Sequence, residues 1–429
     1  MHTTDLDINI EDISKIEGHA SVDIKIRNGK VTDCRFSITE MRRFYMQAIR
    51  GIPAISVPTK VARICGTCSN AHLLCSLEAV EKAYNINISP QTKLLRELLN
   101  FALIIRDHAL HLYIFVLPDY FEKDSILDFD ENNKLEHQML HDCFEVKNVG
   151  NKLAISVGGR SVHAPFLRVG GFSKIPTIDQ LQKNKQLLID SRAKILNLID
   201  IFEKCTWNLT QDVKFVALVN PSYSFLDGII KTSDGRIITE ENYRQSLSTV
   251  KIPYSEATGY QLEGQTYFTG ALARINLNRE ALHTNTQKDT SSALSKFPSN
   301  NIYHNNLAQA IEILHSIDSA LDLIDSYQGL AEEPHKITPI AAFGAGLIEA
   351  PRGILTHHVH IGADGNITKG NVIVPTGQNQ TGIENAIRDF INVNTEKDKK
   401  WLTKEIEKII RAYDPCMSCA THFLKVNWK

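Results

Sequence analysis

Two stretches of the chain alternate between hydrophobic and polar positions, the pattern of strands with one buried face. The first runs through residues 22–26, turns at Asn28-Gly29 and resumes at Val31, so it predicts a β-hairpin over residues 13–39. The second alternating run covers residues 359–374. Both predict sheets that are small relative to a chain of 429 residues.

Apolar residues three and four positions apart recur along much of the remaining chain, as expected of amphipathic helices. Ser89 and Pro90 are typical of a helix start, and Pro118 predicts the end of the same helix. The predicted helices cover residues 62–85, 90–116, 179–209, 305–327, 381–393 and 396–411.

Charged residues interrupt the apolar stripe of the helix predicted at residues 90–116. Arg106, Asp107, His108 and His111 all lie in it. A buried charge is costly unless it is paired or functional. Two interpretations are open at this point: a structural ion pair in the core, or polar groups that face a functional site.

Two further stretches carry weaker patterns. Residues 150–176 contain the pairs Gly158-Gly159 and Gly170-Gly171 and predict short strands and turns. Residues 220–300 are rich in Ser, Thr and Asn and predict a peripheral insertion of β-structure and loops. We therefore expect an α+β fold over residues 1–429, a single unit with a large central helical bundle and small peripheral β-sheets.

Composition and charge exclude several classes of function. The chain has 47 Lys and Arg against 49 Asp and Glu, so it presents no basic field for nucleic acid. No uninterrupted apolar run of about 18 residues predicts a membrane span. The N-terminal residues lack the basic region and apolar core of a signal peptide, which predicts a cytoplasmic protein.

Two Cys-x-x-Cys motifs near opposite ends of the chain are the strongest chemical signal. The first spans Cys65–Cys68 before His72, and the second spans Cys416–Cys419 before His422. A fold that joins the motifs creates a tetrathiolate site for zinc, an iron–sulfur cluster or another soft transition metal. The long separation of the motifs disfavours a small zinc knuckle, but a long-range structural zinc stays open.

A series of ordered motifs over residues 15–422 resembles the large subunit of [NiFe] hydrogenases. The cysteine motifs occur within Arg63-Ile64-Cys65-Gly66-Thr67-Cys68 and Asp414-Pro415-Cys416-Met417-Ser418-Cys419. The other matching stretches are Lys15-Ile16-Glu17-Gly18-His19, Gly158-Gly159-Arg160-Ser161-Val162-His163, Gly270-Ala271-Leu272-Ala273-Arg274, Glu349-Ala350-Pro351-Arg352-Gly353 and Val374-Pro375-Thr376-Gly377-Gln378-Asn379. The last is similar to forms in the soluble, cofactor-linked branch of that family.

The resemblance implies a metal centre with a defined ligand set. Cys65, Cys68, Cys416 and Cys419 would bind nickel, and Cys68 and Cys419 would bridge to an iron that carries CO and cyanide ligands. Soft thiolate donors suit both metals. His72 would donate a hydrogen bond to a cysteine sulfur.

The resemblance also assigns polar residues around the metals. Asp107 and Asp414 would hold Arg352 above the centre, which would explain the charge inside the long helix. Arginine stays protonated, so orienting H2 electrostatically is an easier role for Arg352 than acting as a base. A terminal thiolate, Cys65 or Cys416, is a candidate base, and Glu17 would pass the proton outward.

Two further features concern ligands at the edge of the site. Thr376 and the backbone near Pro375 would hydrogen-bond a cyanide. His422 is a candidate ligand for a second metal, Mg or Fe. Relatives supply a Glu to that metal where this chain has a position at or beside Tyr45, so the second site is an open question. Relatives are also cut after the matching histidine, and seven residues follow His422 here.

The function implied by the resemblance is reversible cleavage of H2, with electrons passed to an iron–sulfur small subunit, then to further electron-transfer subunits. Two alternatives stay open. One is an H2 sensor that binds the same metals with low turnover. The other is a structural, complex-I-like subunit that has lost its metal, which the four retained cysteines disfavour.

Overall fold

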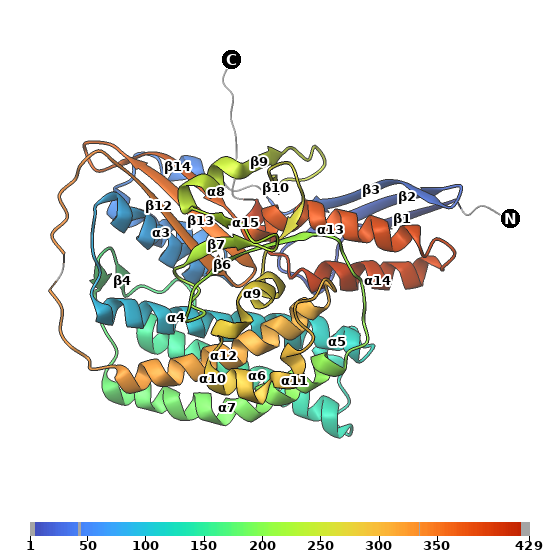
Figure 1. Ribbon diagram of the computed structural model, residues 1–429, viewed down its shortest axis with the longest axis horizontal. Coiled ribbons are helices and arrows are strands. Elements are labelled where there is room, and N and C mark those ends of the chain that lie inside the picture. The colour runs from blue at the N-terminus through green and yellow to red at the C-terminus, as the bar shows by residue number, and fades with distance from the viewer. Residues whose placement is uncertain (1–4, 42–43, 334, 422–429) are drawn as a thin grey trace, which may run out of the picture.

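The computed structural model describes residues 5–41, 44–333 and 335–421. Four long helices form a bundle that lies across the lower half of Figure 1, with the small sheets and the C-terminal helices above it. The bundle helices are α4 (Pro90–Ala109), α6 (Lys134–Gly158), α7 (Ile178–Lys204) and α12 (His304–Ser326). The predicted α+β class with a helical bundle and small sheets is therefore confirmed.

The ends of the bundle helices follow from local sequence. The Ser89 side chain accepts a hydrogen bond from the backbone N–H of Thr92 at the start of α4. Thr177 and Gln180 form a reciprocal capping box at the start of α7. These contacts satisfy backbone donors that have no partner within the helix.

The prediction that Pro118 ends the long helix is wrong. After α4 the chain continues through a π-helical segment, η3 (Leu110–Val116), into α5 (Leu117–Tyr120). Pro118 lies in the first turn of α5, directly after the π-helical segment, where the hydrogen-bonding register changes. The joined stretch Pro90–Tyr120 is long and apolar enough to cross a membrane, but 83% of its most apolar window is buried inside the protein.

The expectation of strands and turns from residue 150 onward is correct only after residue 158. Helix α6 continues to Gly158 and ends at Gly159, which adopts a left-handed conformation. Gly150 does not break this helix because it lies where α6 crosses α4: an added Cβ would approach Ala102 O and Arg106 N within 2.9 Å. The glycine therefore permits a close helix crossing rather than a turn.

The predicted hairpin is confirmed and belongs to a three-stranded antiparallel sheet. Strands β2 (Ala20–Arg27) and β3 (Lys30–Ile38) turn at Asn28-Gly29, both with positive φ. A strand that the pattern analysis missed, β1 (Leu6–Ile10), pairs with β2. A second three-stranded sheet contains β12 (Ala342–Ala350), β13 (Gly353–Ile361) and β14 (Ile367–Ile373).

The stretch 220–300 is only partly peripheral. Helix α9 (Ala271–Asn278) packs against α12, and its residues from Ala271 to Ile275 are buried in the core. The polar composition of the whole stretch did not predict a buried helix. The charged side chain of Arg274 can be buried because Glu312 and Glu349 pair with it. Strand β6 (Lys214–Val219) directly precedes this stretch, whose other elements are β7 (Ile229–Thr232), β8 (Ile237–Ile238), α8 (Glu240–Ser246), β9 (Leu247–Val250), β10 (Gly259–Leu262), β11 (Tyr267–Phe268), η5 (Arg279–Ala281), α10 (Thr284–Asp289) and α11 (Ser291–Leu294).

The remaining elements bring the two ends of the chain together. Helix α3 (Ser69–Ala83) follows the first cysteine motif, and α13 (Pro375–Asn392) and α14 (Lys399–Ala412) lead to the second, which begins α15 (Met417–Ala420). The short elements are α1 (Tyr45–Ala48), η1 (Ala54–Ser56), α2 (Val57–Val61), η2 (Ala62–Ile64), η4 (Ile126–Asp128), β4 (Leu167–Arg168) and β5 (Gly171–Phe172).

Strand β12 lies directly on helix α3, and glycine makes this contact possible. A Cβ on Gly346 would overlap the backbone of Cys75 and lie 2.9 Å from Ala79 N. We expect Gly346→Ala to lower the free energy of unfolding by about 3 kcal/mol, since backbone cannot move aside as a side chain can. Denaturant unfolding measures this change.

A matched control for Gly346→Ala is available in β5. A Cβ on Gly171 would meet only Thr92 Oγ1, at an ordinary contact distance of 3.7 Å. Gly171→Ala should change stability by less than about 0.5 kcal/mol. Equal stabilities of the two variants would contradict the close packing of β12 on α3.

Candidate metal centre

Four cysteine sulfurs from the two motifs meet in the interior. The Cys65 and Cys416 sulfurs are 3.4 Å apart, and the Cys68 and Cys419 sulfurs are 3.0 Å apart. All four sulfurs lie within 4.8 Å of one another, and all four residues are buried. The predicted joining of the motifs into one site is thus present in the fold, with a spacing that a single compact metal centre can span.

Both cysteine motifs are presented at helix starts. Cys65 is extended after η2 and Cys68 precedes the first residue of α3. Cys416 precedes α15, and its segment pairs with Glu17 through a backbone hydrogen bond from Met417 N to Glu17 O of 2.9 Å. The N-terminal and C-terminal parts of the chain therefore form the site jointly.

Burial and mutual hydrogen bonds shift the pKa values of the cysteine thiols in opposite directions. Burial raises the pKa of the Cys416 and Cys419 thiols well above the ordinary value. Hydrogen bonds from the neighbouring thiols lower the pKa of Cys65. One thiolate is thus stabilised by its neighbours, whereas several thiolates in the same volume need a cation to offset their burial and mutual repulsion.

A small cavity of about 10 Å³ adjoins the sulfurs on one side, about the space of one water-sized group. Structural zinc sites are closed by their four ligands, whereas reactive sites keep an open side. The wall combines apolar and polar groups: Cys68, His72, Ala350, Pro351, Arg352, Leu355, Pro375, Thr376, Cys416 and Cys419. This arrangement favours a reactive centre with small ligands over a structural zinc.

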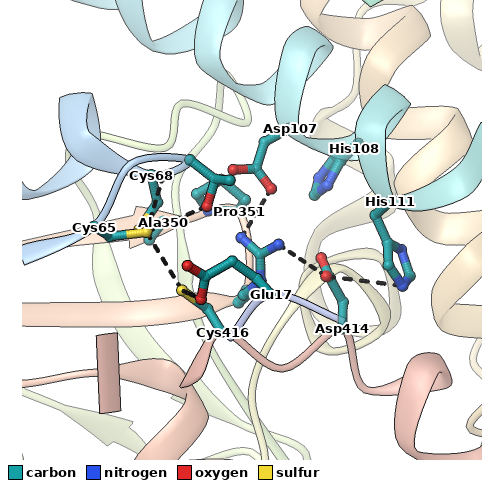
Figure 2. A network of polar contacts seen from close by, with 12 residues as sticks. Glu17, Cys65, Cys68, Asp107, His108, His111, Ala350, Pro351, Asp414 and Cys416 are labelled. Carbon is teal, nitrogen blue, oxygen red and sulfur yellow. Dashed lines mark hydrogen bonds and ion pairs between the residues drawn. The ribbon is translucent and has the colours of Figure 1, made fainter. Parts of the chain in front are cut away.

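Arg352 lies at this cavity and is held by two buried carboxylates, those of Asp107 and Asp414, which Figure 2 labels. Its Nη1 donates to Asp107 Oδ1 at 2.8 Å, and its Nη2 donates to Asp414 Oδ1 at 2.9 Å. Burial alone would lower the pKa of Arg352, but the two carboxylates raise it well above its usual value. The charge of Asp107 within α4 is therefore paired, as the structural interpretation predicts, and its partner Arg352 lines the cavity.

Glu17 lies against the second cysteine motif. Its Oε2 lies 3.0 Å from the Cys416 sulfur and accepts a hydrogen bond from Ser418 N at 3.1 Å. Glu17 itself is half-buried. Burial is the main reason why the pKa of its carboxyl is raised.

The remaining predicted site residues fall into three groups. His72 Nε2 lies 3.6 Å from the Cys419 sulfur, and its Nδ1 lies 3.1 Å from His357 Nε2. Pro375 and Thr376 line the cavity, and the Thr376 hydroxyl accepts a hydrogen bond from Cys416 N at 2.9 Å. His422 and the tail after it lie outside the described residues, so the structure adds nothing on the second metal site.

Comparison with known proteins agrees with this geometry. The family described as nickel-dependent hydrogenase matches residues 47–144 and 238–422, and the HoxL-like family matches residues 7–41. The chain is 31% identical to the alpha chain of sulfhydrogenase 2 of Pyrococcus furiosus, over 98% of this chain and 100% of that protein. It is 28% identical to a subunit of the F420-non-reducing hydrogenase of Methanothermobacter marburgensis, over 97% and 94%.

The chain belongs to the nickel-dependent hydrogenase family. Solved structures share its fold: an NAD+-reducing [NiFe]-hydrogenase in the H2-reduced state matches with a TM-score of 0.82 at 24% identity, over 97% of this chain and 99% of that one. The Ni-Fe-Se hydrogenase of D. vulgaris Hildenborough matches with a TM-score of 0.77 at 20% identity, over 98% and 100%. The predicted family resemblance is confirmed.

The residues of this hydrogenase fit the cofactor of its family, a nickel–iron centre with CO and cyanide on the iron. The four sulfurs offer soft donors, and a small cavity adjoins them on one side. Arg352 Nε and Asp107 Oδ2 are buried and make no hydrogen bond within the described part of the chain. Thr376 keeps its own O–H donor after accepting from Cys416 N.

Two further polar residues support Asp414 in this hydrogenase: His111, which the sequence placed among the polar positions of its helix without a role, and Gln309, which the sequence did not indicate. His111 Nδ1 is 2.6 Å from Gln309 Oε1, and Gln309 Nε2 donates to Asp414 Oδ2 at 2.9 Å. Burial lowers the pKa of His111, which favours its neutral form. The position of His111 one helical turn after Asp107 was the available signal. Gln309 had none, because its helix α12 is distant in sequence.

A buried arginine also supports the first cysteine motif. Arg106 donates a hydrogen bond to the backbone oxygen of Thr67, and the Thr67 hydroxyl lies 3.2 Å from the Cys65 sulfur. Burial lowers the pKa of Arg106, and the charge of Asp107, followed by those of Cys68 and Cys65, opposes that effect. The arginine thus fixes the loop that carries two ligands and adds positive charge beside them.

Proposed function

We propose that this chain is the catalytic large subunit of a cytoplasmic [NiFe] hydrogenase that interconverts H2 with two protons and two electrons. The observation that carries the proposal is Arg352, paired with two carboxylates, on the open side of the four-cysteine site. Burial of a charged guanidinium is costly, and a purely structural metal site does not require one on its open side. We further propose that residues 1–429 act as one catalytic unit.

Each group around the site then has a definite task. When bound, the nickel–iron centre supplies the chemistry that splits H2. Cys65, Cys68, Cys416 and Cys419 hold it, and His72 hydrogen-bonds the Cys419 sulfur. Thr376 and the backbone near Pro375, which line the cavity, would hydrogen-bond a cyanide there.

Arg352 orients H2 by the electrostatic field of its fixed guanidinium. Asp107 and Asp414 hold that guanidinium and keep it protonated, so it acts as a charge rather than as a base. The Cys416 sulfur receives the proton, because Glu17 is within hydrogen-bonding distance of it. Glu17 then passes the proton outward.

Electrons leave through a second protein chain. Among residues 5–41, 44–333 and 335–421, the four cysteines form the single group able to hold a metal, so this part of the chain has no relay of its own. The similar proteins from P. furiosus and M. marburgensis are named as subunits, which supports a multi-subunit enzyme. We propose that the direct partner is an iron–sulfur small subunit, with further electron-transfer subunits behind it.

The proposal is tested by an infrared spectrum of the purified complex, with nickel and iron quantified in the same sample. The expected result is sharp CO and cyanide bands with about one nickel per chain, together with H2-dependent dye reduction. Zinc in place of nickel and no such bands, in protein expressed with its maturation factors, would contradict it. Sharp CO and cyanide bands with negligible H2-dependent dye reduction would indicate the H2 sensor instead.

Replacement of Glu17 by glutamine separates proton transfer from metal binding. Glu17→Gln keeps the size and the acceptor oxygen for Ser418 N but cannot release a proton. We expect unchanged nickel content and a loss of about 100-fold in H/D exchange activity. The matched control is Glu384→Gln, whose carboxylate also accepts a backbone hydrogen bond, from Phe36 N. Unchanged H/D exchange activity in Glu17→Gln would show that the proton does not leave through Glu17.

A further inference from the structure

Arg274 of helix α9 makes an unusually complete set of hydrogen bonds in the core. Its Nε and Nη2 donate to the two oxygens of Glu312, at 2.6 and 2.7 Å, and its Nη1 donates to Glu349 Oε2 at 2.7 Å. Its remaining donors reach backbone oxygens: Ala350 O at 3.2 Å and Pro351 O at 3.0 Å. All five N–H groups of a guanidinium are therefore used.

The two backbone acceptors belong to the wall of the metal cavity. Ala350, Pro351 and Arg352 follow one another at the end of β12, and all three line that cavity. Figure 2 shows Ala350 and Pro351 close to Cys68 and Asp107. Arg274 thus holds the segment immediately before Arg352 by its peptide oxygens, and any shift of these oxygens moves the Arg352 backbone.

Glu312 connects Arg274 with the other support of Arg352. Its Oε2 lies 2.9 Å from His108 Nε2, and His108 is the residue after Asp107 on α4. Its Oε1 also accepts a hydrogen bond from Tyr223 at 2.8 Å. Burial alone would raise the pKa of Glu312, but Arg274 and then His108 lower it to about 2, so the carboxylate is ionised.

Arg352 is therefore held both at its guanidinium and at its backbone, and the Arg274–Glu312 pair supports both contacts. Asp107 holds the guanidinium from α4, and the Ala350–Pro351 segment holds the backbone from β12. Arg274 and Glu312 tie α9, α12, α4 and β12 together at that point. Neither residue lines the cavity.

We propose that Arg274, with Glu312, is a positioning residue for H2 activation: it fixes the backbone of the Ala350–Pro351 segment and thereby the guanidinium of Arg352 over the metal centre. The proposal rests on the role of Arg352 given above. A displacement of about 1 Å at a reacting centre is enough to lower the rate strongly. Precise support of the Arg352 backbone is therefore a kinetic requirement.

Lysine cannot replace Arg274 in this position. An ammonium group has three donors that radiate from one point, whereas the five acceptors here surround a planar fork. Arg274→Lys keeps the positive charge between Glu312 and Glu349. Its three N–H groups cannot reach all five acceptors, so at least two of them lose their hydrogen bond to residue 274. We expect the backbone oxygens to lose their donors first, because the carboxylates attract the ammonium more strongly.

The test uses Arg274→Lys in the assembled, metal-loaded complex. We expect nickel and iron contents to stay normal, the CO and cyanide infrared bands to shift, and kcat for H2 oxidation to fall by at least about tenfold with little change in KM. A purely structural role would leave the band positions unchanged. Normal bands with normal kcat in a metal-loaded variant would overturn the proposal.

Arg96→Lys is the matched control. Arg96 is also a buried arginine that pairs with both oxygens of one glutamate, Glu81, at 2.6 Å each, and donates to a backbone oxygen, Arg168 O. It does not line the metal cavity. This variant should lose stability to a similar degree while its infrared bands and kcat stay normal. Equal band shifts in both variants would show a general response to core damage and overturn the proposal.

A double variant separates this proposal from the role of Arg352 itself. If Arg274 acts through Arg352, Arg274→Lys combined with Arg352→Lys should be no slower than Arg352→Lys alone. Independent, multiplying losses would overturn the positioning role. Normal turnover of Arg352→Lys alone would instead refute the role assigned to Arg352.

Tyr223→Phe provides a milder variant if Arg274→Lys fails to assemble. It removes one hydrogen bond to Glu312 and keeps every charge in the cluster. We expect a smaller band shift in the same direction and a severalfold loss of kcat. Unchanged bands and kcat in Tyr223→Phe would count against the proposal.

Discussion

Replacement of Cys416 by serine is expected to leave a folded chain that retains no nickel and has no hydrogenase activity. The Cys416 sulfur lies 3.4 Å from that of Cys65 and 3.0 Å from that of Cys419, so it contacts one sulfur of each motif. A serine hydroxyl is a hard, neutral donor at physiological pH, so the site loses both a soft ligand and a negative charge. With three sulfurs left in the buried site, we expect the affinity for nickel to be too low for retention.

Metal quantification of the purified variant measures this result directly. Cys143→Ser is the control, because Cys143 is fully buried on α6 but is not among the four clustered sulfurs. The control should keep about one nickel per chain, and circular dichroism should show that both variants fold. A full nickel content in Cys416→Ser would refute the assignment of the site.

Replacement of Arg352 by lysine should produce the opposite combination, a complete metal centre with very low turnover. The guanidinium bridges Asp107 and Asp414 with two separate nitrogens, and a single ammonium cannot occupy both positions. The fixed charge beside the metals is then displaced. Loss of one preorganised electrostatic group costs about 100- to 1000-fold in kcat.

Infrared bands and H2-dependent dye reduction, measured on the same preparation, test the Arg352→Lys prediction. The control is Arg236→Lys, which changes an arginine that pairs with Asp234 and Glu263 on the protein surface. That variant should match the unchanged enzyme in bands and in turnover. Normal turnover of Arg352→Lys with intact bands would remove this residue from the mechanism.

Sequence alone determined the parts of this protein whose signals are local. The hairpin of β2 and β3 follows from alternation and from Asn28-Gly29, which accept the positive φ of a tight turn. The start of α4 follows from Ser89 and Pro90. The two cysteine motifs and their neighbours were recognisable as ligand sets, since their spacing and residue types are themselves the chemistry.

Other features were invisible because their causes lie far away in the sequence. Gly150 looks like a helix breaker until α4 is seen against it, and Pro118 looks like a helix end until the π-helical segment shifts the hydrogen-bonding register. The polar stretch around Arg274 looked peripheral because hydropathy counts a charged side chain as exposed. Its partners Glu312 and Glu349 come from other elements.

The division between sequence and tertiary structure has one physical reason. Propensity, capping and ligand chemistry act over a few residues, so composition and spacing record them. The pairing of buried charges acts through space, and it requires that several helices and strands meet at one point. The sequence therefore determined which cysteines are candidate metal ligands, whereas the tertiary structure decided how Arg352 and Arg274 are held beside them.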